Sequence, residues 1–239
     1  MTGTPEFAYT VVIPAFNAAR TLAEAIQSAL HQTVAPRAIT VVDDGSSDDT
    51  PAIACSFRKY VTLISQAHSG PAEATDRGLA GVQTPFVAGL DADDLWLPQK
   101  IERQVARLHE VPALDAVFCR AYIFRHGSAP ATDGPAQDLW GRSTMLMRME
   151  AARRIGPVAY EADPVMHGEM IRWLYRGRRL GLTFEMMSEV LGGRRIIEGS
   201  LSYGQDASAL LPLLRQRLRR RTSDTRAVCG TDSPPRANY

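Results

Sequence analysis

Cysteine is scarce in this sequence, and no two cysteines have the spacing of a metal site. The three residues, Cys55, Cys119 and Cys229, are far apart in a chain of 239 residues and form no Cys-x-x-Cys pair. This arrangement excludes the common zinc frameworks and disfavours a disulfide scaffold. We therefore expect reduced thiols and a cytoplasmic protein.

Charge of one sign and long hydrophobic runs are also missing. Lys and Arg number 27 against 26 Asp and Glu, which leaves a formal net charge of +1. No overall field would then attract nucleic acid or an anionic membrane surface. No run approaches the ~20 apolar residues that span a bilayer, and residues 1–10 lack the pattern of a signal peptide. We expect no transmembrane segment and no nucleic-acid partner, and the oligomeric state stays open.

Three ligand-binding signatures of α/β proteins are absent as well. The sequence has no Gly-x-Gly-x-x-Gly after its first expected strand, no P-loop and no Gly-x-Ser-x-Gly elbow. These absences disfavour a nicotinamide or flavin site, a P-loop NTPase and an α/β-hydrolase.

The first half of the chain alternates short β-branched runs with helix-like segments. This pattern is typical of consecutive βαβ units around a mainly parallel sheet. The strands that it predicts are Tyr9–Pro14, Ile39–Val42, Val61–Ser65 and Pro85–Leu90. Helical spacing of apolar residues predicts helices over residues 22–30 and 71–82 and from Pro98 onward.

The pattern weakens beyond residue 115. Runs at Ala116–Phe124 and Met145–Met149 predict two further strands. The small and breaker residues of Gly127–Leu139 predict a loop, and helical spacing predicts a helix over Met170–Arg178.

Polar segments follow three of the expected strands, at the point where each strand ends. These segments are Ala15–Asn17, Asp43–Ser47 and Asp91–Asp94. The carboxyl ends of parallel strands form one edge of an open sheet, and ligands bind in the crevice outside that edge. We therefore expect segments distant in sequence to meet at one site.

Asp91 and Asp93 stand two residues apart directly after an apolar strand, so in extended geometry their side chains project to the same face. Two close carboxylates repel unless something neutralises them, and Mg²⁺ or Mn²⁺ shared with phosphate oxygens would do so. The alternative is an Asp-rich turn that caps the helix beginning near Pro98.

Asp43 and Asp44 also have two interpretations. They can make side-chain-to-backbone turn bonds with Ser46 and Ser47, or a carboxylate can accept a hydrogen bond from a base or ribose. Both can hold at once, with Asp43 structural and Asp44 on the ligand.

Four segments together resemble the N-terminal half of family 2 glycosyltransferases in order and spacing. They are VVIPAFN (11–17), VVDDGSSDDT (41–50), SGPAEATDRGL (69–79) and FVAGLDADDLWLPQKIERQV (86–105). The resemblance implies an α/β GT-A fold, a Rossmann-like, mostly parallel sheet flanked by helices with a less regular acceptor-side half. It also implies a nucleotide-diphospho-sugar donor, a UDP-sugar or a dTDP-sugar, with Mn²⁺ or Mg²⁺ at a D-x-D motif and inversion at the anomeric carbon.

Positions that match the family carry its roles as expectations. The donor-side residues are Pro14, Ala15 and Asn17 beside the nucleoside, Asp43 and Asp44 toward the base, and Asp91 with Asp93 as the D-x-D that holds the metal. The sequence departs from the family at Thr75, where an Arg is common.

On the acceptor side, the resemblance points to HGEMIRWLYRGRRLGL (167–182), the segment that commonly carries the catalytic base. Glu169 is our candidate base and Asp163 the reserve, while Met170 occupies the position where the family often has Asp. The alternative for Glu169 is an acid that favours the dipole of its helix.

We expect one domain over residues 1–214, with a nucleotide-sugar-binding half at 1–94 and an acceptor-side half at 95–214. Residues 215–239 would form a basic helix end and a disordered tail. The leading hypothesis is metal-dependent sugar transfer to a saccharide, small molecule or peptide. The alternatives are a non-catalytic sugar-nucleotide or carbohydrate-binding relative and, less favoured, a D-x-D phosphohydrolase.

Overall fold

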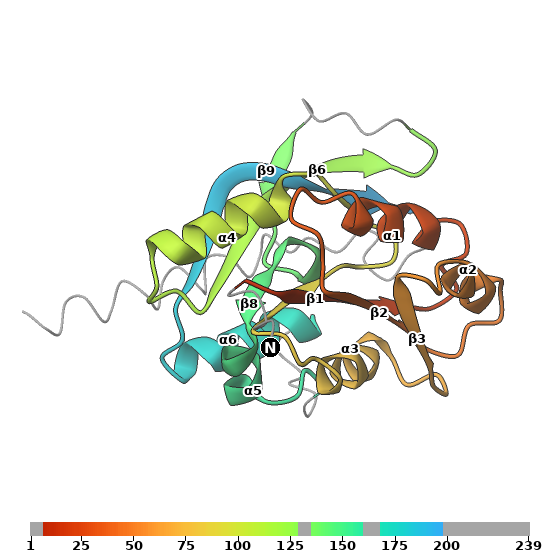
Figure 1. The fold of residues 1–239 in the computed structure, drawn as a ribbon, viewed down its shortest axis with the longest axis horizontal. Coiled ribbons are helices and arrows are strands. Elements are labelled where there is room, and N and C mark those ends of the chain that lie inside the picture. Colours follow the sequence, from red (N-terminus) through yellow and green to blue (C-terminus); the bar gives the residue numbers. More distant parts are fainter. Residues whose placement is uncertain (1–6, 129–134, 160–167, 198–239) are drawn as a thin grey trace, which may run out of the picture. The chain divides into compact units, whose positions relative to one another are not determined.

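The structure, a computed structural model, describes residues 7–128, 135–159 and 168–197, and these belong to one compact unit (Figure 1). The described residues form a nine-stranded sheet. Its strands are β1 (Tyr9–Ala15), β2 (Ala38–Asp43), β3 (Val61–Ser65), β4 (Phe86–Gly89), β5 (Leu95–Trp96), β6 (Ala116–Arg125), β7 (Ala136–Asp138), β8 (Leu146–Arg148) and β9 (Phe184–Ile196). Their order is β3-β2-β1-β4-β8-β6-β9-β5, with β7 paired to β6.

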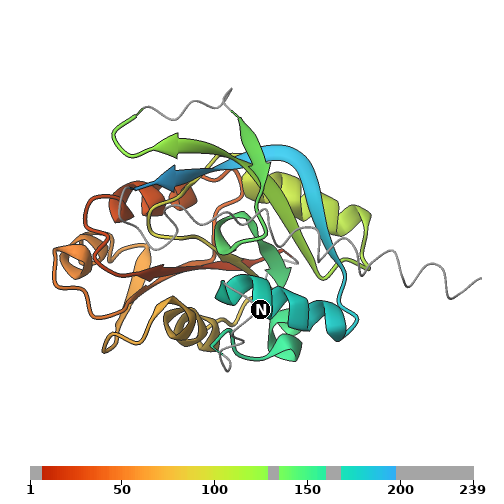
Figure 2. The same cartoon turned by 180° about the vertical axis from the view of Figure 1, so that it is seen from behind.

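Helices cover both faces of this sheet. They are α1 (Leu22–Leu30), α2 (Thr50–Ser56), α3 (Pro71–Ala80), α4 (Lys100–Glu110), α5 (Met149–Ile155) and α6 (Glu169–Arg179), with a 3₁₀ turn η1 at Arg142–Thr144. Figures 1 and 2 show α1 and α4 on one side of the sheet and α3, α5 and α6 on the other. Successive residues of β1 point to opposite faces of the sheet. Ile13 packs in the hydrophobic core that includes α1, and Val12 packs in the core that includes α6.

The parallel half follows the βαβ pattern of the sequence. β1 pairs in parallel with β2 and β4, and β2 pairs in parallel with β3. The observed strands differ from the predicted ones by at most one residue at either end, and Val61–Ser65 matches in full. The carboxyl ends of β1, β2 and β4 therefore lie along one edge.

The second half differs from the sequence prediction in three places. The predicted loop at Gly127–Leu139 contains β7, which pairs antiparallel with β6. Met149, predicted as the end of a strand, begins α5. The long strand β9 was not predicted, and it runs parallel to β6 with register shifts near Arg120. The predicted basic helix end and tail at 215–239 lie outside the described residues.

No helix among the described residues is both long and apolar enough to cross a bilayer.

Candidate functional site

The segments that follow β1 and β2 are hydrogen-bonded to each other. Asn17 Oδ1 accepts from the backbone N–H of Ser47 at 2.9 Å, and the N–H of Asn17 donates to Ser46 Oγ at 2.9 Å. Asn17 adopts φ 47°, in the left-handed region that Asn tolerates better than most residues. Pro14 and Ala15 are buried within β1 itself. The structure thus brings the first two predicted segments together.

Asp44 is buried behind this edge, and its carboxylate is surrounded by donors. It accepts from Gln66 Nε2 at 2.7 Å and from the N–H groups of Ser69 at 2.9 Å and Gly70 at 2.8 Å, and it contacts His68 Nδ1 at 2.9 Å. Burial raises its pKa, but these donors and the His68 charge outweigh burial and leave the pKa below its usual value. Asp44 therefore holds the loop that leads into α3, and its predicted contact with a base stays a prediction.

Asp43 follows the structural interpretation. Its carboxylate is buried, and Oδ1 accepts from the N–H of Ser46 at 3.3 Å, a side-chain-to-backbone bond that shapes the turn after β2.

An exposed aromatic pair, which the sequence analysis did not single out, lies beside Asp44. The Phe16 ring stacks on the His68 ring with centroids 4.1 Å apart and planes at 27°, and Phe16 is 46% exposed. A large apolar side chain left in solvent at a ligand-binding edge offers a flat surface for a planar group. The available signal was Phe16 itself, an aromatic residue directly after the first strand.

The Asp91–Asp94 turn follows β4 and combines buried and accessible carboxylates. Burial, and after it the charge of Asp91, raise the pKa of Asp93 to about 6. Burial also raises the pKa of Asp94 well above its usual value, and Asp94 Oδ1 accepts from the N–H of Arg195 at 3.0 Å. This turn therefore holds close carboxylates with incomplete charge compensation.

The sequence offered Arg195, with Arg194, as a contact of the donor diphosphate from a loop, with an exposed, solvated arginine as the alternative; the structure places Arg195 on β9, beside the acidic turn. Its guanidinium is buried, donates from Nε to the carbonyl of Asp93 at 2.8 Å and pairs with Glu24 of α1. The sequence did not predict β9, the strand that carries Arg195 to the acidic turn, so the burial of Arg195 was not predicted either.

Asp91 is the more accessible carboxylate, with its side chain 36% exposed, and both of its oxygens have protein partners. Oδ1 pairs with Arg142 Nη1, and Oδ2 accepts from Ser143 Oγ at 3.0 Å. The described residues contain no group of three or more His, Cys, Asp or Glu side chains arranged to hold a metal ion. Asp93 nevertheless fits one divalent cation with phosphate oxygens as further ligands, because a cation would stabilise a carboxylate whose pKa is raised first by burial and then by the charge of Asp91.

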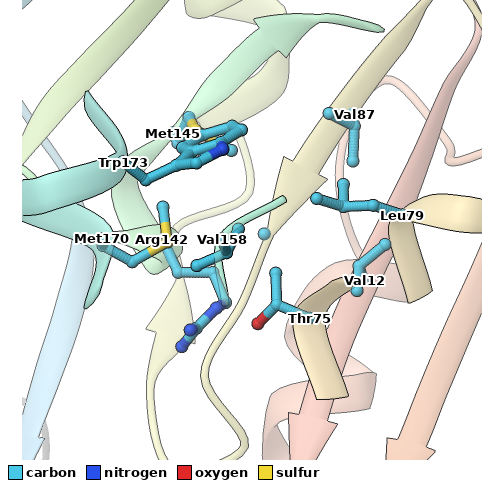
Figure 3. A pocket seen from close by; sticks show the side chains of 10 residues that line it. Val12, Thr75, Leu79, Val87, Arg142, Met145, Val158, Met170 and Trp173 are labelled. Carbon is cyan, nitrogen blue, oxygen red and sulfur yellow. The ribbon is translucent and has the colours of Figure 1, made fainter. Parts of the chain in front are cut away.

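Glu169 is the first residue of α6, and its carboxylate pairs with the arginine that also contacts Asp91, Arg142. Arg142 Nη2 donates to Glu169 Oε1 at 3.2 Å, and the Glu169 side chain is 28% exposed. Asp163, the reserve base, lies outside the described residues. Met170 is buried in the core beside Trp173, as Figure 3 shows, so this position supplies packing and no carboxylate.

An α/β sheet of this order, with acidic turns at the carboxyl ends of its parallel strands, defines a GT-A fold. The crystal structure of Staphylococcus aureus TarS 1–349 in complex with UDP-GlcNAc matches with a TM-score of 0.67 and 16% identity, over 91% of this chain and 73% of that chain. The complex of the same protein with UDP matches with a TM-score of 0.65 over 93% of this chain and 74% of that chain. At this identity the likeness shows the fold.

The family model of glycosyl transferase family 2 matches residues 10–156. The match covers more than half of the chain, and the chain belongs to this family. The family and the GT-A fold that the four sequence segments predicted are thus confirmed.

Curated relatives match over less than half of the chain. An uncharacterized glycosyltransferase of Rickettsia prowazekii is 34% identical over 111 residues, 46% of this chain and 35% of that protein. An uncharacterized glycosyltransferase of Nostoc sp. is 38% identical over 100 residues, 40% of this chain and 31% of that protein. The Escherichia coli UDP-Glc:alpha-D-GlcNAc-diphosphoundecaprenol beta-1,3-glucosyltransferase WfgD is 31% identical over 105 residues, 43% of this chain and 42% of that protein. The chain spans less than half the length of these relatives.

Proposed function

We propose that this protein transfers a sugar from a nucleotide-diphospho-sugar to an acceptor, with inversion at the anomeric carbon and with a divalent cation. The observation that carries the proposal is that one guanidinium, that of Arg142, contacts both Asp91 on the expected donor side and Glu169 on the expected acceptor side. The chain in which this contact occurs belongs to glycosyl transferase family 2. Residues after β1, β2 and β4 would bind the donor.

The nucleoside would lie along the edge formed by Pro14, Ala15 and Asn17, with its base on the Phe16 ring. The stacked His68, held by Asp44, would support that ring from behind. A UDP-sugar is favoured over a dTDP-sugar, because TarS was crystallised with UDP and UDP-GlcNAc and the name of WfgD contains UDP-Glc.

Asp93 would hold the cation, Mn²⁺ or Mg²⁺, together with the donor phosphates. Asp91 is the predicted second ligand, through Oδ2, which would first have to leave Ser143, while Oδ1 stays paired with Arg142. When bound, the cation would neutralise the charge that develops on the departing diphosphate.

Glu169 would act as the general base. The acceptor hydroxyl gives its proton to Glu169 as its oxygen attacks the anomeric carbon, and the bond to the diphosphate breaks with its electron pair on the phosphate oxygen. Attack opposite the leaving group inverts the anomeric carbon. The acceptor would be a saccharide, a small molecule or a peptide, and we place the reaction in the cytoplasm, in keeping with the free thiols of Cys55 and Cys119.

The test is release of nucleoside diphosphate from a panel of UDP- and dTDP-sugars with Mn²⁺, with Mg²⁺ and with a chelator. We expect turnover with at least one UDP-sugar, loss of turnover in chelator, and a loss of at least 100-fold in kcat for Asp93→Asn and for Glu169→Gln. Full turnover in chelator, or unchanged turnover in Asp93→Asn, would refute the metal role.

A non-catalytic sugar-nucleotide-binding relative is the second candidate, and the buried Met170 favours it because no second carboxylate accompanies Glu169 at the start of α6. Wild-type protein that binds UDP with Mn²⁺ but turns over no sugar in the panel would support this candidate against the enzyme.

A further inference from the structure

One buried arginine joins the two sides of the candidate site. Arg142 lies in η1 and its side chain is 5% exposed. One terminal nitrogen pairs with Asp91 in the turn after β4, and the other donates to Glu169 at the start of α6. These contacts reach 51 residues back and 27 residues forward along the chain, so local sequence does not create them.

The aliphatic part of the Arg142 side chain passes over Gly89 of β4, where no side chain stands in its way. At Gly89 a Cβ atom would overlap Arg142 Cγ, so any larger residue there would displace the arginine stem. The stem passes an apolar cavity of about 10 Å³ that Met145, Met170 and Trp173 help to line, and Figure 3 shows the guanidinium pointing away from Trp173 and Met145. Beyond the cavity, the guanidinium contacts the two acids, Asp91 and Glu169.

Neighbouring contacts hold the backbone of η1 in place. Trp96 Nε1 donates to the carbonyl of Ser143 at 2.7 Å, and Gln104 Nε2 donates to the carbonyl of Thr144 at 2.7 Å. The arginine therefore extends from a fixed segment, and its planar fork of donors sets the spacing of the two carboxylates that it contacts.

Most buried polar side-chain atoms in folded proteins have a hydrogen-bond partner, so a buried donor without one needs a reason. Within the described residues, Arg142 Nε is buried and has no hydrogen-bond partner, while both terminal nitrogens are directed to acids of the site. Burial with one unsatisfied donor is unfavourable for folding. This arrangement favours a role in the site over a role in stability alone.

We propose that Arg142 is a positioning residue that fixes the Glu169 carboxylate relative to Asp91 and thereby sets the distance between the base and the donor. The proposal rests on the proposed function, because it concerns the geometry of the same reaction. Displacement of a catalytic group by about 1 Å can lower a rate by about 100-fold.

The test compares Arg142→Gln, Arg142→Lys, Glu169→Gln and the double variant Arg142→Gln/Glu169→Gln, with kcat and donor KM measured on the sugar nucleotide that the panel identifies. We expect Arg142→Gln to lower kcat about 100-fold with a smaller change in donor KM. The double variant should be no slower than Glu169→Gln alone, because residues that act as a unit have non-additive effects. Arg142→Lys should recover only part of the rate, because one ammonium cannot span both acids.

Arg107→Gln is the matched control. Arg107 also pairs with two acids, Glu185 and Glu110, but on α4 and away from Asp91 and Glu169, so its kcat should equal that of the wild type. Equal kcat for Arg142→Gln and wild type would overturn the proposal. So would a double variant slower than Glu169→Gln by the full effect of Arg142→Gln.

Two further measurements keep the outcome decisive. Should Arg142→Gln fail to fold, Gly89→Ala displaces the stem without removing the charge, and we expect it to lower kcat as well. Should the wild type turn over no sugar, the proposed function fails, and the urea midpoints of the Arg142 and Glu169 variants still test the coupling between these two residues. If the two are coupled, the midpoint shift of the double variant is smaller than the sum of the two single shifts. Additive shifts would overturn the coupling.

Discussion

Asp44 shows how one buried residue can organise a loop at the edge of a sheet. Four donors from the loop after β3 converge on its buried carboxylate, and they include the His68 ring that stacks on Phe16. The pair DD after the second strand predicted a polar edge correctly. The direction of the Asp44 carboxylate depends on the loop after β3, which lies more than 20 residues further along the chain.

We predict that Asp44→Asn lowers the free energy of unfolding by about 2 kcal/mol at pH 7, because an amide leaves buried donors without an acceptor. The folded-state pKa of Asp44 lies below the ordinary 3.8. Its contribution is therefore complete above that value and is lost as the pH falls through the folded-state pKa. Urea unfolding at pH 7, 5 and 3 checks this, with the difference between variant and wild type shrinking at pH 3.

The control for this variant is Glu110→Gln, since Glu110 pairs with Arg107 on an exposed surface where ion pairs contribute little. A constant difference between Asp44→Asn and wild type from pH 7 to pH 3 would contradict the assignment.

Phe16→Ala tests the aromatic surface at the same scale. We expect UDP affinity in the presence of Mn²⁺ to fall about tenfold, since base-on-aromatic stacking contributes about 1–3 kcal/mol. Stability should change little, because the ring is half exposed. Tyr60→Ala, which removes another exposed ring, is the control for calorimetric titration with UDP, and equal losses in the two variants would rule out a specific base contact.

At the element scale, the sequence predicted the parallel part of the sheet. The runs that became β1, β2 and β3 are rich in β-branched and other apolar residues and are bounded by turn residues, which favours strands even at β3, where burial is only partial. β9 was not predicted because its sequence, FEMMSEVLGGRRI, has no regular alternation of apolar and polar residues and contains two glycines. Its pairing depends on β6, where the Tyr122 ring lies in the space that a side chain at Gly193 would need.

The packing of α3 on the sheet gives a prediction of the same kind. A Cβ atom at Gly78 would overlap a methyl group of Val12 on β1. Overpacking typically costs about 1–3 kcal/mol, while the helix propensity of Ala over Gly contributes about 1 kcal/mol. We therefore expect Gly78→Ala to lower the unfolding free energy by about 1 kcal/mol.

Gly81→Ala is the matched control, because Gly81 lies just past the same helix with its nearest neighbour 3.7 Å from an added Cβ. Denaturant unfolding should show no loss for Gly81→Ala. A Gly78→Ala protein more stable than wild type would show that the helix moves away from β1 at no cost.

At the scale of the whole molecule, the expected order of strands and helices predicted at which edge of the sheet the site lies. It did not predict Arg142, the residue that joins the two sides of the site. Parallel strands with crossover helices place the ends of β1, β2 and β4 on one edge, and that rule alone brought Asn17 beside Ser47. Arg142 could not be predicted this way. It depends on η1 returning to β4 after β6 and β7, in a half of the sheet where antiparallel and parallel pairs mix.

Ligand-linked stability tests the molecule as a unit. A ligand present at 100 times its Kd stabilises the folded state by about 2.7 kcal/mol, and in a chain of 150–250 residues each kcal/mol raises Tm by about 2–4 °C. We therefore expect UDP with Mn²⁺ to raise Tm by about 5–10 °C, and UDP alone to raise it by less. Asp93→Asn should respond equally to UDP with and without Mn²⁺, because it lacks the carboxylate that would hold the cation. A Tm that UDP with Mn²⁺ leaves unchanged in the wild type would count against donor binding at this edge.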